Sequence, residues 1–153
     1  MEEAVVADAM RTHMLLRTTG ETRKALATLD TAAEVNVISP LLVAELELTK
    51  SNVKEPRMHW GSGRHAFCHG AYKITWEATD SLGKTETRED LFYALEQEGA
   101  EVILGMPCMR AARIEINTAE YQWRFHPGPS PLSLISGVEL AKEIEGVRHI
   151  FSL

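Results

Sequence analysis

The residues best suited to chemistry in this sequence are its aspartates, and the 153-residue chain has four: Asp8, Asp30, Asp80 and Asp90. Asp30 alone follows an apolar alternating segment, residues 25–29, and precedes small residues. A carboxylate in that position is expected at the end of a buried strand, on a tight turn that backbone can approach closely. Two such carboxylates side by side share one proton, and the pair can activate a water molecule for attack on a carbonyl.

Two interpretations of Asp30 follow from its surroundings. It is either the acid of an aspartic-peptidase site, with the Thr31 hydroxyl beside it, or a turn aspartate that caps its own backbone, which is common. Asp80 and Asp90 have Leu82 and Phe92 at the third position, where a peptidase loop needs a small residue. Only Asp30 therefore qualifies, and one chain supplies one carboxylate.

The hydrophobic pattern predicts a mostly β chain around these residues. Alternation of apolar and polar residues predicts strands and hairpins, which we place at 11–18, 24–29, 57–69, 73–78, 85–93, 101–105 and 113–125. Ser39-Pro40 predicts the start of a short apolar helix through Leu48, and residues 107–113 predict one or two further helical turns. Trp76, Trp123, Tyr121 and Phe125 are expected at alternating core positions of the strands.

A Pro-rich segment, residues 126–131, marks a predicted boundary. We expect one domain over residues 1–126. Residues 127–153 are expected to be a linker and C-terminal extension, with a short helix at 138–145 and a terminal strand at 147–151.

Composition excludes several classes of function. The net charge of −6 argues against a nucleic-acid-binding surface. No apolar run approaches the roughly 20 residues that span a bilayer, so no membrane partner is expected. The acidic start Met1-Glu2-Glu3 and the two cysteines, Cys68 and Cys108, favour an intracellular, cytoplasmic protein.

The sequence gives little support for a metal site or for a cysteine nucleophile. His59, His65, Cys68 and His69 lie close in sequence, but their spacing fits no common zinc site, so we expect no metal and no cofactor. Cys108 is expected to be a small core residue, because no orienting histidine for a nucleophile can be identified.

Four segments occur in the order found in one known family: Asp30-Thr31-Ala32-Ala33, Val37-Ile38-Ser39-Pro40, Gly61-Ser62-Gly63 and Ile103-Leu104-Gly105-Met106-Pro107. Together they resemble the retropepsin-like aspartic proteases, over about residues 15–125. Asp80 to Phe92, with Gly105-Met106-Pro107, looks most like the proteases of Ty3/gypsy-type LTR retrotransposon polyproteins. The resemblance implies a closed β-barrel of the acid protease fold, with a flap hairpin and one or two short helices.

The resemblance also implies roles for individual residues. Asp30 would be the catalytic carboxylate, and Thr31 would hydrogen-bond its counterpart across a two-fold axis. Ala33 would line the cleft, and Glu34 would bond the substrate backbone. The remaining residues complete the active-site loop (Ala32) and the flap tip (Gly61, Ser62 and Gly63). Ala32 departs from the family, which mostly has glycine there, and alanine fits only where φ is not positive.

Two functions remain open at this point. The first is an aspartic endopeptidase, active as a homodimer with one Asp-Thr-Ala loop per chain. It would cleave an extended peptide of a retroelement-type polyprotein with a water activated between two aspartates. The alternative is a catalytically inactive retropepsin-like module for dimerisation or peptide binding.

Overall fold

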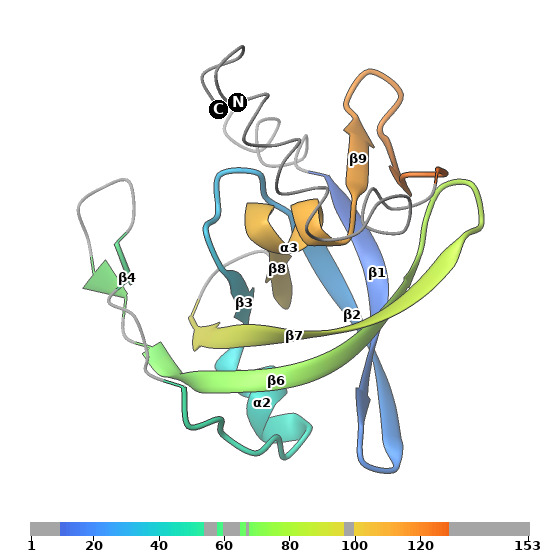
Figure 1. The fold of residues 1–153 in the computed structure, drawn as a ribbon. Coiled ribbons are helices and arrows are strands. Elements are labelled where there is room, and N and C mark those ends of the chain that lie inside the picture. The colour runs from blue at the N-terminus through green and yellow to red at the C-terminus, as the bar shows by residue number, and fades with distance from the viewer. Residues whose placement is uncertain (1–9, 54–57, 60–64, 67, 97–99, 129–153) are drawn as a thin grey trace, which may run out of the picture.

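The structure is a computed structural model that describes residues 10–53, 58–59, 65–66, 68–96 and 100–128. Within these residues the chain forms two short helices and ten strands (Figure 1). The helices are α2 (Pro40–Glu45) and α3 (Met106–Ala111). The strands are β1 (Arg11–Thr18), β2 (Glu21–Leu29), β3 (Asn36–Ile38), β4 (Met58–His59), β5 (His65–Ala66), β6 (Cys68–Thr79), β7 (Thr85–Leu95), β8 (Val102–Leu104), β9 (Ile114–Asn117) and β10 (Gln122–Phe125).

Six strands close into a barrel in the order β1-β2-β8-β3-β7-β6. The long hairpins β1–β2 and β6–β7 are antiparallel, and β1 also pairs with β6 to close the barrel. Side chains along a strand alternate between the barrel interior and the outside. In β2, Ala25, Ala27 and Leu29 are buried, while the residues between them are more exposed. The predicted closed β-barrel is confirmed.

Strand β8 lies between the two strands that flank the Asp30 loop. It runs parallel to β2, with Leu29 opposite Leu104, and antiparallel to β3, with Val37 opposite Ile103. The chain thus leaves the barrel after β2, makes the loop of residues 30–35, and returns as β3 on the other side of β8. This arrangement places β8, which lies about seventy positions further along the chain, against the loop of residues 30–35.

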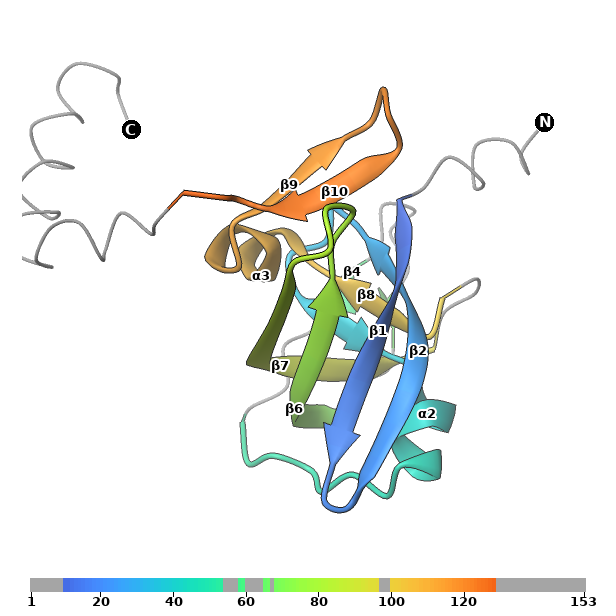
Figure 2. The same ribbon diagram turned by 90° about the vertical axis from the view of Figure 1, so that its right-hand side faces the viewer.

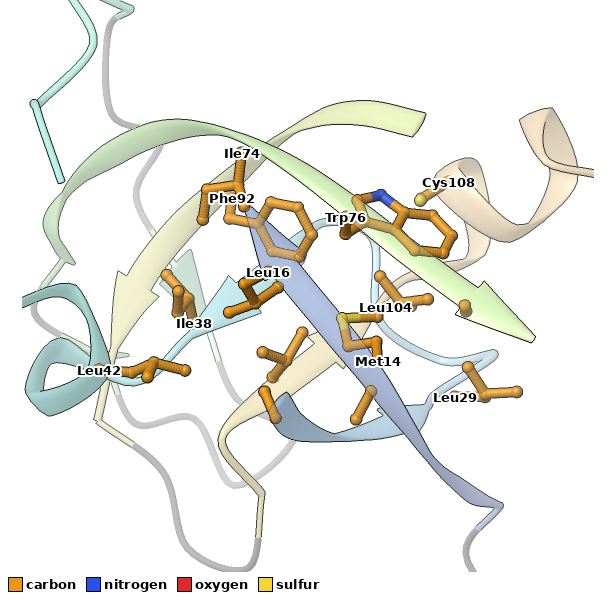
Figure 3. Close-up of a cluster of buried hydrophobic side chains, with 14 of the residues drawn as sticks. Met14, Leu16, Leu29, Ile38, Leu42, Ile74, Trp76, Phe92, Leu104 and Cys108 are labelled. Atoms are coloured by element: carbon orange, nitrogen blue, oxygen red, sulfur yellow. The ribbon is translucent and has the colours of Figure 1, made fainter. Parts of the chain in front are cut away.

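The barrel interior is filled by large apolar side chains from most of its strands. Trp76 and Phe92 are fully buried, and Met14 and Leu16 of β1 lie among them (Figure 3). Burying side chains of this size contributes about 2 kcal/mol each to stability. The predicted core positions of Trp76, Trp123 and Phe125 are confirmed.

Helix α2 begins where the sequence predicts it. Ser39 Oγ accepts a hydrogen bond from the Leu41 amide (3.3 Å), and Pro40 occupies the first turn. The helix does not extend to Leu48 as predicted. It ends at Glu45, because Glu47 adopts a left-handed conformation (φ 51°) that a helix cannot continue through.

Helix α3 and the β9–β10 hairpin lie at one end of the barrel, and α2 lies at the other (Figures 1 and 2). β9 and β10 pair only with each other in the described part of the chain. The prediction that Tyr121 occupies a core position is wrong. Tyr121 belongs to the turn before β10, has a positive φ of 52° and is 50% exposed.

The strands expected to carry the flap pair with each other as β4 and β5, with His59 opposite His65. The predicted flap tip, Gly61-Ser62-Gly63, lies outside the described residues. So do the predicted helix at 138–145 and the predicted strand at 147–151. Among the helices that the structure describes, none is long and apolar enough to cross a membrane.

Candidate active site

Asp30 is the residue that directly follows β2, as predicted. Its backbone amide donates to the Leu104 carbonyl (3.0 Å), which continues the β2–β8 pairing by one residue. Its carboxylate Oδ1 accepts a hydrogen bond from the Ala32 amide (2.9 Å), and the Ala33 amide donates to the Asp30 carbonyl (3.2 Å). No described residue donates to the other carboxylate oxygen, so Oδ2 can act on a water or a second carboxylate.

The rest of the loop presents its residues at the surface. Thr31, Ala32 and Glu34 are exposed, and Asp30 and Ala33 are partly buried. Asp30, Thr31, Ala32, Ala33 and Glu34 therefore form one continuous surface segment beside α3. The structure brings these five predicted site residues together; the predicted substrate contacts Gly61, Ser62 and Gly63 lie outside the described part.

The alanine that replaces the usual glycine causes no backbone strain. In the part of the chain that the structure describes, the non-glycine residues with positive φ are Glu47, Arg113 and Tyr121. Ala32 is not among them, so its methyl group does not force a left-handed conformation. Alanine at position 32 requires a φ that is not positive, and this requirement is met.

The Asp30 loop packs against three consecutive residues, Leu104, Gly105 and Met106, where β8 leads into α3. Leu104 accepts from Asp30, and the Met106 amide donates to the Ala33 carbonyl (2.8 Å). Between them, a Cβ on Gly105 would lie 2.6 Å from the Val35 carbonyl oxygen. Only glycine allows this approach, because the obstructing atoms are backbone.

Sequence reasoning missed Asn36. Its buried side chain accepts from the Gly105 amide through Oδ1 (2.9 Å) and donates to the Leu91 carbonyl through Nδ2 (3.1 Å). The available signal was a polar residue within the apolar run Val35 to Ile38, directly after the Asp30 loop. A buried side-chain carboxamide needs hydrogen-bond partners, and those of Asn36 lie far along the chain.

The other two described aspartates serve the fold. Asp80 is buried, and its carboxylate accepts from the amides of Leu82 (2.9 Å), Lys84 (2.8 Å) and Phe125 (2.9 Å). Burial acts to raise the pKa of Asp80, but these three hydrogen bonds and the Lys84 charge outweigh it and lower the pKa. Asp90 accepts from the indole of buried Trp76 (2.7 Å).

Cys108 is a buried core residue, as predicted. Burial, together with the neighbouring Asp90 carboxylate, raises the pKa of its thiol to about 12. The thiol donates to Asp90 (3.5 Å) and remains protonated at neutral pH. A protonated thiol is a poor nucleophile, so this environment does not suit a cysteine peptidase.

The described side chains include no cluster of three His, Cys, Asp or Glu residues placed to hold a metal. Among the residues that raised this question, the side chains of His59 and His65 lie outside that part. Cys68 is partly buried and donates to the Gly70 carbonyl (3.5 Å), whereas His69 is exposed.

The chain matches no protein-family model, and no curated protein matches it in sequence. Solved structures do resemble it. The retroviral protease-like domain of Ddi1 from Leishmania major superposes with a TM-score of 0.54 at 12% identity, covering 78% of this chain and 90% of that one. EIAV protease complexed with the inhibitor HBY-793 gives a TM-score of 0.47 at 16% identity, covering 67% of this chain and 86% of that one.

The barrel thus has the retropepsin-like fold, a mostly β closed barrel, and this prediction is confirmed. The closer resemblance to Ty3/gypsy-type proteases stays a prediction.

Proposed function

We propose that this protein is an aspartic endopeptidase that acts as a homodimer. The observation that carries the proposal is the Asp30 loop: a carboxylate at the end of β2, fixed through one oxygen by the Ala32 amide. The described aspartates Asp80 and Asp90 are committed to structural hydrogen bonds. The second carboxylate of the pair is therefore supplied by Asp30 of a second copy.

A two-fold axis through the Asp30 loops gives the required chemistry. The paired carboxylates share one proton, because two like charges at such close range cannot both ionise. The ionised carboxylate takes a proton from water as the water attacks, and the protonated one hydrogen-bonds the scissile carbonyl oxygen. Thr31 is exposed beside Asp30 and would bond its counterpart and tie the two loops together, as the sequence resemblance implies.

The β9–β10 sheet also favours association. Among the described strands, β9 and β10 pair only with each other, so the sheet has an edge to which a strand of a second chain can add. Pairing with a second copy of this chain would extend the sheet at the end of the barrel that carries α3 and the Asp30 loop.

The proposed substrate is an extended peptide within a retroelement-type polyprotein. Ala33 and Glu34 line its path and the flap tip Gly61–Gly63 closes over it, as the sequence resemblance implies. An intracellular, cytoplasmic location agrees with the free thiols of Cys68 and Cys108.

The test is digestion of a peptide library by the purified chain near pH 5. We expect cleavage by the wild type, its loss in Asp30→Asn, and inhibition by a statine-type compound. Glu21→Gln is the matched control, because it removes an exposed carboxylate from the other end of the same strand. Asp30→Asn should retain the wild-type circular dichroism spectrum.

A wild-type chain that is demonstrably dimeric and cleaves nothing would contradict the proposal and favour the inactive module. Cleavage of generic peptides without cleavage at polyprotein junctions would instead refute only the proposed substrate.

A further inference from the structure

Asn36 connects three parts of the barrel through one buried side chain. It is 7% exposed, and in the described part of the chain only Asn36 and Asp80 are buried polar residues. Its carboxamide accepts from the Gly105 amide and donates to the Leu91 carbonyl. The start of β3 is thereby joined to β7 and to the junction of β8 with α3.

The bond to Gly105 fixes the middle of the segment that holds the Asp30 loop. The residues on either side, Leu104 and Met106, hydrogen-bond Asp30 and Ala33. Gly105 itself is packed against the loop backbone, where an added Cβ would lie 2.9 Å from the Ala33 carbonyl oxygen. A shift of Gly105 therefore moves the backbone that orients the Asp30 carboxylate.

We propose that Asn36 is a positioning residue for the Asp30 carboxylate; this inference rests on the proposed peptidase function. Hydrolysis requires the two carboxylates of the dimer to share one proton and one water, which tolerates little displacement. A misplacement of about 1 Å can cost roughly a hundred-fold in rate. Asn36 limits that displacement without touching the substrate.

A purely structural role for the carboxamide would affect the whole barrel, but the strand pairing argues for a local effect. β3 is also held by backbone pairing with β7 and β8, where Val37 lies opposite Tyr93 and Ile103. This pairing does not depend on the Asn36 side chain. Removing the carboxamide is thus expected to loosen the Gly105 amide and the loop above it more than the barrel.

The experiment compares Asn36→Leu with Asn36→Asp in the dimeric full chain. Leucine keeps the volume and loses both hydrogen bonds, so we expect kcat to fall by roughly ten- to a hundred-fold, with KM within about three-fold of wild type. A buried aspartate is protonated in mildly acidic solution, where it can accept from Gly105 and donate to Leu91. Asn36→Asp should thus retain activity near pH 5 and, as pH rises, lose activity at a pH where the wild type is still active.

Asp80→Asn is the matched control, because it disturbs the other buried polar side chain without touching the loop. Assayed below its unfolding temperature and at a concentration at which sedimentation shows it to be dimeric, it should keep kcat within about two-fold of wild type. The proposal is overturned if Asn36→Leu folds and keeps wild-type kcat, or if Asp80→Asn lowers kcat as much for an equal loss of stability. If Asn36→Leu does not fold, an Asn36→Asp pH profile identical to that of the wild type overturns it.

Hydrogen exchange provides a readout that does not depend on activity. In Asn36→Leu, or in Asn36→Asp at neutral pH, the amides of Asp30, Gly105 and Met106 should exchange at least about ten-fold faster while the β1–β2 amides keep their protection. A uniform increase across the barrel would show a merely structural role. If the wild type cleaves no peptide, the proposed function fails, and the positioning role is refuted or supported by this exchange pattern alone.

Discussion

At the scale of single residues, the three described aspartates differ in what their carboxylates accept. Asp80 accepts three backbone amides and Asp90 accepts an indole N–H, so both are fixed in the fold. Asp30 accepts one amide from its own loop, through Oδ1. The same residue type is therefore structural or available for chemistry according to its hydrogen bonds, and these are set by position along the strands.

The Asp30 loop also depends on a residue without a side chain. Gly105→Ala would place a methyl carbon 2.6 Å from the Val35 carbonyl oxygen, although its φ of −87° suits alanine. We expect a loss of stability of about 2 kcal/mol, as for other overpacked sites, together with lower peptidase activity. Urea unfolding and the library digest measure the two effects.

Gly20→Ala is the control for this substitution. Gly20 has a φ of +81° and no neighbour within 4 Å, so alanine there incurs only the cost of a left-handed conformation, about 1 kcal/mol. Gly20 lies at the β1–β2 turn, so the Gly20→Ala variant should keep wild-type activity. Wild-type activity and stability in Gly105→Ala would show that the loop does not depend on this close approach.

At the scale of elements, the turn of one hairpin is attached to a second sheet. The Asp80 carboxylate caps the β6–β7 turn and accepts the Phe125 amide of β10, while the Ser81 amide donates to the Trp123 carbonyl (3.0 Å). These bonds hold β10 against the barrel. The β9–β10 hairpin is therefore oriented by a turn more than forty residues earlier in the chain.

Asp80→Asn should destabilise the protein by roughly 2–3 kcal/mol at pH 7, because a charged acceptor of three buried bonds is lost. The folded-state pKa of Asp80 is lowered, so its stabilising contribution is present above the ordinary value of 3.8 and is lost as pH falls through the folded pKa. Urea unfolding at pH 7 and near pH 3 should show the difference between wild type and variant shrinking at the lower pH. An unchanged difference would contradict this assignment.

At the scale of the whole molecule, the proposed function requires two chains. One barrel offers one loop of the predicted type, and an active site on a two-fold axis takes Asp30 from each copy. The proposed activity would therefore depend on assembly as well as on the loop.

Mixing of chains tests this requirement directly. Adding a ten-fold excess of Asp30→Asn chains to the wild type should lower activity to roughly a tenth once subunits exchange, because most wild-type chains then pair with a variant. The same excess of Glu21→Gln chains should raise the activity. Dilution of the wild type below the dimer Kd should reduce specific activity, as sedimentation confirms dissociation. Activity that is proportional to the number of wild-type chains in the Asp30→Asn mixtures would rule out a shared site.

Much of the local structure could be predicted from the sequence. The strands around 11–29, 73–78 and 85–93 and the start of α2 at Ser39 appear where periodicity and capping place them. Asp30 was predicted at the end of a buried strand from its neighbours alone. The extent of α2 and the burial of Tyr121 were predicted wrongly, because left-handed backbone at Glu47 and Tyr121 left no mark in the apolar pattern.

The sequence by itself determined where the β1–β2 and β6–β7 hairpins lie and that Asp30 alone, among the four aspartates, joins an apolar strand to small residues. These features depend on residues within a few positions of one another. Only the tertiary structure decided that β8 lies between β2 and β3, that Gly105 supports the loop and that Asn36 holds Gly105 across 69 positions. Such contacts depend on packing between distant segments, and a hydrogen-bond partner that far along the chain has no signature in local periodicity.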